Sequence, residues 1–153
     1  MNIQSLTKQT ALFAAASVLL TRTLPADAQE AASSPTGPRT VFSAPLPDLP
    51  GTHLEVVELF YPPKDGPPST ADNYPRSGHH HPGSVYLYVT EGAIRIGVEG
   101  HGVSIVEKGG SYFEPPKVHH MFTESASRTE SARVIAVMIV PDGESSVVQG
   151  KSE

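Results

Sequence analysis

The chain of 153 residues contains no cysteine. It therefore has no disulfide bond, no thiolate metal ligand and no cysteine nucleophile, and it lacks the residue through which bacterial lipoproteins are anchored. Aromatic residues are also few, at 7%, and the formal net charge is −5 at pH 7. Lys and Arg do not gather into the basic patch of a nucleic-acid-binding protein. We therefore expect no nucleic acid among its partners.

The first 28 residues have the pattern of a secretory signal peptide. Lys8 lies in a polar start, an apolar run extends from Thr10 to Leu20, and Ala26-Asp27-Ala28 forms a small-x-small cleavage site. The apolar run is too short to span a bilayer. We therefore expect a periplasmic or secreted protein that has no membrane attachment after cleavage.

The remaining sequence is long enough for one domain with a hydrophobic core. It has no convincing helical periodicity, and short apolar runs alternate with Gly- and Pro-containing turns. Seven or eight short strands joined by turns predict an all-β sandwich or barrel. The predicted strands are 40–43, 54–61, 84–90, 93–98, 103–106, 111–114, 120–123 and 132–140.

The sequence after the predicted signal peptide divides into three segments. Residues 29–39 are small and polar and form a flexible linker, residues 40–141 form the barrel domain, and residues 142–153 form a flexible tail. Residues 62–78 make an unusually long, proline-rich loop. Long loops in compact domains are often functional, so we expect a lid or rim over a site.

Two groups of histidines suggest what that site is. His79, His80 and His81 follow the long loop, and His119 and His120 precede a later strand. Side chains alternate along an extended chain, so His79 and His81 share a face, about 7 Å apart along the strand. Two imidazoles on one face can converge on a metal ion. The alternative is a solvated, histidine-rich loop.

The spacing of these residues resembles the two sequence motifs of the cupin superfamily. The first motif, G-x5-H-x-H-x3-E-x6-G, is matched at His79, His81 and Gly92. The second, G-x5-P-x-G-x2-H-x3-N, is matched at Gly109, Pro115 and His120. The resemblance covers residues 54–141 and implies a single-domain jelly-roll β-barrel. It also implies His79, His81 and His120 as metal ligands, with His80 and His119 outside the ligand set.

Three departures from the cupin motifs matter. Val85 stands where the first motif has its glutamate ligand, Lys117 replaces a glycine, and Glu124 replaces the final asparagine. The last two are turn positions, but the first removes the usual carboxylate ligand. We expect Val85 to face the metal beside an open coordination position.

Glu114 is the candidate catalytic residue. A carboxylate just before Pro115 could act as a base, as a hydrogen-bond partner of a histidine, or as a fourth metal ligand. The alternative is a strand-edge glutamate that faces water. Seven further side chains are candidates for the pocket wall or the core: Tyr86, Tyr88, Tyr112, Phe113, Met121, Phe122 and Met138.

Three neutral imidazoles leave coordination positions open, as in catalytic metal sites. The resemblance therefore implies a metal-dependent, dioxygenase-like oxidoreductase that acts on a small organic substrate. Fe, Mn, Zn, Ni and Cu all remain candidates for the divalent transition metal. A lyase or isomerase without redox change and a non-catalytic ligand-binding or sensing cupin are the alternatives. A homodimer is also left open.

The signal peptide predicts where the mature protein begins. When the chain is expressed in a bacterium with its own N-terminus, we expect it in the periplasm, starting near Gln29. N-terminal sequencing of the periplasmic fraction measures this. Soluble cytoplasmic protein that still begins at Met1 would contradict the prediction.

Overall fold

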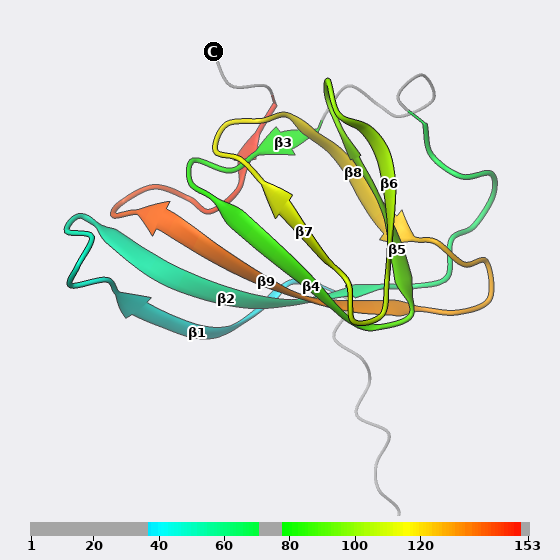
Figure 1. Cartoon of the computed structure of the whole chain (residues 1–153), viewed down its shortest axis with the longest axis horizontal. Coiled ribbons are helices and arrows are strands. Elements are labelled where there is room, and N and C mark those ends of the chain that lie inside the picture. The colour runs from blue at the N-terminus through cyan, green and yellow to red at the C-terminus, as the bar shows by residue number, and fades with distance from the viewer. Residues whose placement is uncertain (1–36, 71–77, 151–153) are drawn as a thin grey trace, which may run out of the picture. The chain divides into compact units, whose positions relative to one another are not determined.

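The computed structural model describes residues 37–70 and 78–150 (Figure 1). The predicted signal peptide and most of the predicted linker lie outside these residues. None of the described residues forms a helix that is long and apolar enough to cross a membrane. The regular elements of the described residues are the following ten strands: β1 (Arg39–Pro45), β2 (Thr52–Tyr61), β3 (His79–His80), β4 (Val85–Glu91), β5 (Ala93–Val98), β6 (Gly102–Glu107), β7 (Ser111–Glu114), β8 (His120–Ser125), β9 (Ala132–Pro141) and β10 (Val148–Gln149).

The strands form two antiparallel sheets, as predicted for an all-β jelly roll. The first sheet has the order β1-β2-β9-β4-β7, and the second has the order β10-β3-β8-β5-β6 (Figure 1). One hydrophobic cluster joins them, because it includes Val57, Leu87 and Val134 from the first sheet and Ile94 and Ile96 from the second. The core therefore lies between the two sheets.

Strand β9 shows why these residues form a sheet. Its β-branched residues favour an extended chain, and its side chains alternate between buried and half-buried along all ten residues. Ala136 and Met138 are among those on the buried side. β9 pairs with β2 on one side and with β4 on the other, so it lies at the centre of the first sheet.

The predicted strands agree closely with the structure, and two of them, 93–98 and 111–114, have the same bounds as β5 and β7. Two short strands were not predicted. Val148 and Gln149 pair with His80 and His79, so the described part of the predicted tail contains β10. The backbone N–H of Gly150 also donates to the carbonyl of Gly78 at 2.7 Å. The described part of the predicted flexible tail, up to residue 150, thus contains a short strand that pairs with the histidine segment.

The described part of the long loop is held by Glu124. Its carboxylate accepts hydrogen bonds from the backbone N–H and the hydroxyl of Ser69, at 2.9 and 2.6 Å. Lys64 Nζ lies 3.3 Å from the same carboxylate, and these partners hold the pKa of Glu124 below its usual range despite burial. The motif asparagine is thus replaced by a residue that fastens residues 64–69 to β8. Residues 71–77 lie outside the described residues.

Candidate metal centre

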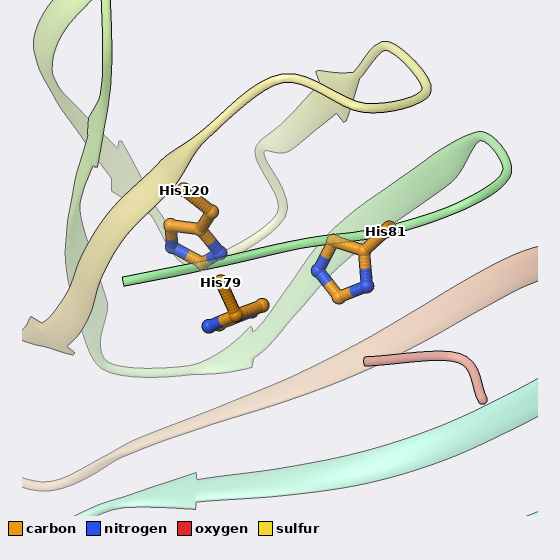
Figure 2. Close-up of side chains that lie close together, drawn as sticks. All are labelled: His79, His81 and His120. Carbon is orange, nitrogen blue, oxygen red and sulfur yellow. The ribbon is translucent and has the colours of Figure 1, made fainter. Parts of the chain in front are cut away.

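Strand pairing brings the three predicted histidine ligands together. His79 in β3 lies directly opposite His120 in β8, and His81 is the first residue after β3. A ligand atom from each of the three rings lies within 4.8 Å of the other two. Figure 2 shows the rings gathered from two separate segments of the chain. The alternative of a solvated loop does not fit, because His81 and His120 are buried.

The surrounding groups select which ring nitrogens face the common space. His81 Nδ1 lies 2.6 Å from the carbonyl oxygen of Ser146, so it must donate, and Nε2 keeps its lone pair. His120 Nε2 lies 2.7 Å from the hydroxyl of Thr123. His120 Nδ1 is buried and has no hydrogen-bond partner among the described residues. An orphaned imidazole nitrogen beside two other imidazoles fits a divalent transition metal.

Burial also keeps these rings in the neutral form that binds metals. Desolvation, and then the neighbouring His81, His119 and His80, lower the pKa of His79 to about 4. Desolvation, followed by His79, lowers the pKa of His120 to about 3. Burial also lowers the pKa of His81, although its hydrogen bond to Ser146 acts in the opposite direction. All three imidazoles are therefore neutral at neutral pH.

Glu114 lies beside the histidines and not in water. Its side chain is only 3% exposed, and Oε2 lies 3.7 Å from His81 Nε2 and 3.4 Å from His120 Nδ1. Desolvation raises the pKa of Glu114 to about 7. The strand-edge alternative is thus excluded, and the carboxyl group faces the ligand cluster.

The other histidines lie outside the cluster. His80 Nδ1 lies 3.0 Å from the carbonyl oxygen of Gly150. His119 is buried, and its Nδ1 lies 3.1 Å from Glu99 Oε2. His53 Nδ1 lies 3.1 Å from Asp142, and His101 is exposed.

The three histidines and Glu114 line a pocket of about 430 Å³. Most of the wall is apolar, from the buried sides of β2, β9 and β4: Val57, Leu59, Val85, Leu87, Ala136 and Met138. Of the seven aromatic and methionine candidates, only Met138 lines this pocket. Tyr86, Tyr88 and Phe113 are exposed instead.

Sequence reasoning missed two parts of this wall. Ser146, Val147 and Gln149 come from the predicted tail, and no local signal marks them. Glu55, Val57, Leu59 and Tyr61 are spaced two residues apart along β2 and all line the pocket. That period of two could have identified them from the sequence.

A family model described as "Cupin domain" matches residues 73–138. The matched segment contains both histidine motifs. Residues 73–138 therefore form a cupin domain.

The solved structures that are similar to this cupin domain include two structures of an epoxidase. One is Fe(II) HppE with substrate, at 27% identity and a TM-score of 0.43, covering 56% of this chain and 45% of that chain. The other is hydroxypropylphosphonic acid epoxidase from S. wedmorenis, at 26% identity and a TM-score of 0.41. This match covers 58% of this chain and 44% of that chain. The structure of protein NMB1881 from Neisseria meningitidis matches at 15% identity and a TM-score of 0.41. This match covers 67% of this chain and 82% of that chain. This cupin spans less than half the length of the two epoxidase chains. No curated protein sequence matches it.

Lys117 shows how this cupin accommodates one motif departure. It has a φ of 64°, in the left-handed region that normally favours the glycine of the motif. Its backbone N–H donates to the carbonyl of His81 at 2.7 Å. The turn before β8 is therefore tied to the histidine segment even though the glycine is absent.

The geometry predicts which histidines hold metal. His79→Ala, His81→Ala and His120→Ala should each lose most of the bound metal, because each removes one donor of the three. The matched controls His80→Ala and His119→Ala should keep it. Metal per chain after dialysis, measured by plasma mass spectrometry, checks this. Unchanged metal content in all three of the first variants would show that the ligand assignment is wrong.

The pKa shifts predict an unusual pH dependence for the metal-free protein. The lowered pKa values of His79 and His120 give stability that is lost as pH falls from 6.5 towards 4. The raised pKa of Glu114 gives stability that is present below 4.5 and lost as pH rises through about 7. That loss is on the order of 3 kcal/mol for a shift from 4.5 to about 7.

Glu114→Gln should abolish the loss of stability on the neutral side, because the amide does not ionise. Urea unfolding in the presence of EDTA, repeated from pH 4.5 to 8, measures it. The parent and the variant share the histidine contribution, so the difference in their unfolding free energies isolates Glu114. A difference that stays constant from about pH 4.5 to 8 would contradict the assignment.

Proposed function

We propose that this cupin is an exported, metal-dependent oxidoreductase of the dioxygenase-like type, acting on a small organic substrate. The observation that carries the proposal is the position of the three histidines, which lie together in the wall of a largely apolar pocket. A volume of about 430 Å³ suits a small organic molecule. The N-terminal signal-peptide pattern supports export.

Different residues of the chain have different roles in the proposed site. His79, His81 and His120 would hold the metal, which when bound supplies a Lewis acid or redox centre with open positions. The carbonyl of Ser146 orients His81, so the C-terminal segment sets the direction of one ligand. Val57, Leu87 and Met138 form an apolar wall that keeps water from the reacting groups.

The native metal tests the redox part of the proposal. We expect iron or copper in protein purified without an affinity tag from its own compartment, as determined by elemental analysis. Zinc or nickel alone would instead favour the lyase or isomerase alternative, because these ions polarise a substrate without a redox change.

A diatomic probe tests the open coordination position. Anaerobic, Fe(II)-loaded protein exposed to nitric oxide should give the S = 3/2 electron paramagnetic resonance signal of an iron–nitrosyl adduct. His120→Ala, which lacks one ligand, is the control and should give little of this signal. Fully loaded parent protein that gives no signal would show that no position is open to a small diatomic molecule.

A further inference from the structure

We propose that Glu114 is a fourth protein ligand of the metal, and that it takes the place of the motif glutamate that is absent at Val85. This inference rests on the proposed metal site and selects one of the three roles that the sequence leaves open for Glu114. It assigns the carboxylate to a different strand from the one that carries it in the cupin motif.

Strand register places the two positions side by side. Val85 in β4 pairs directly with Glu114 in β7. Residues opposite each other on antiparallel strands have Cβ atoms about 4.5–5.5 Å apart. Both side chains are buried and line the same pocket. A carboxylate that starts at position 114 therefore enters the region that one starting at position 85 would reach.

The distances fit a shared ion. Glu114 Oε2 lies 3.7 Å from His81 Nε2 and 3.4 Å from His120 Nδ1. Two ligand atoms that each lie ~2.1 Å from a tetrahedral ion are ~3.4 Å apart. Both nitrogens are the ones left free for coordination by Ser146 and Thr123. One ion could thus lie between these three atoms. The set of ligand atoms that all lie within 4.8 Å of one another consists of the three histidines, so Glu114 meets the ion from the side of His81 and His120.

The charge balance points the same way. Among the described residues, His81 and His120 are the only basic side chains within 4 Å of the Glu114 carboxylate. Buried charges in proteins are paired or coordinate metals. Neutral imidazoles cannot balance the carboxylate, whereas a divalent cation can.

The pairing of β4 with β7 also explains why a valine stands at position 85. Like charges directly opposite each other on neighbouring strands are destabilising. With Glu114 in place, a second carboxylate at position 85 would face it across the β4–β7 pair. A small apolar side chain at position 85 leaves the space to Glu114.

The test compares Co(II) binding to the metal-depleted parent and to four variants. The variants are Glu114→Gln, Glu114→Val, the double variant Val85→Glu/Glu114→Val, and the control Glu55→Gln. Glu55 also lines the pocket and pairs with Met138, which in turn pairs with Val85. Glu55 is therefore a pocket carboxylate in the same cross-strand row as Glu114, but it lies three strands away from it. Affinity is measured by titration calorimetry, and visible absorption of bound Co(II) reports its ligand set.

Glu114→Gln and Glu114→Val should each weaken Co(II) binding more than about tenfold, since even partners outside the ligand set contribute 10–100-fold. The double variant should recover most of that loss, because it returns the carboxylate to the motif position. Glu55→Gln should bind within about twofold of the parent.

Four results would overturn the inference. If Glu114→Gln binds Co(II) as the parent does, Glu114 is not a ligand, although the three-histidine site stands. If the parent itself binds no Co(II), the proposed metal site fails together with the inference. A folded double variant that binds Co(II) as weakly as Glu114→Val would refute the proposal that Glu114 takes the place of the motif glutamate. An equal loss in Glu55→Gln would show that the effect is general to pocket carboxylates. Because Glu114→Gln preserves size, the test remains decisive even if Glu114→Val does not fold.

Discussion

The structure depends on the antiparallel pairing of β9 with β2 and β4. This ten-residue strand has buried and half-buried side chains in strict alternation, so its register fixes which residues of its two neighbours face inwards. A slip of one residue would turn Ala136 and Met138 out of the pocket. Burial of each large aliphatic side chain along these strands contributes about 1.5–3 kcal/mol. The apolar wall and the position of the metal site therefore have the same physical origin.

Within that apolar frame, the histidines and Glu114 form a polar cluster that is costly without an ion. Burial moves the pKa of His79 down to about 4 and the pKa of Glu114 up to about 7. Both shifts express the same preference for uncharged groups in a poorly hydrated space. A divalent cation would reverse that preference for the carboxylate, because it offers the charge that the surroundings lack. Metal binding and folding stability are thus coupled through the same few side chains.

Much of this could be predicted from the sequence because the signals are local. β-branched runs predicted β9, and the spacing of His79, His81 and His120 predicted a cluster that the structure brings together. The orientation of Glu114 could not be predicted, because its side chain faces inwards only through pairing with Val85 in a distant segment. β10 was missed because two residues in polar surroundings carry no periodic signal, and their order depends on His79 and His80. The burial of His119 is likewise a tertiary effect.

The segment after His81 has a consequence for how the protein is assembled. A Cβ atom on Gly83 would overlap the carbonyl oxygen of Ile139, so the turn that follows the histidines lies directly against β9. Ile139 also donates its backbone N–H to the carbonyl of Ser84 at 3.1 Å. His81 further depends on Ser146 for its orientation. These contacts join segments far apart in sequence, and such contacts form late in folding. A chain synthesised only as far as His120 has all three histidines but neither β9 nor Ser146, so the histidine cluster is complete only after the C-terminal segment has folded.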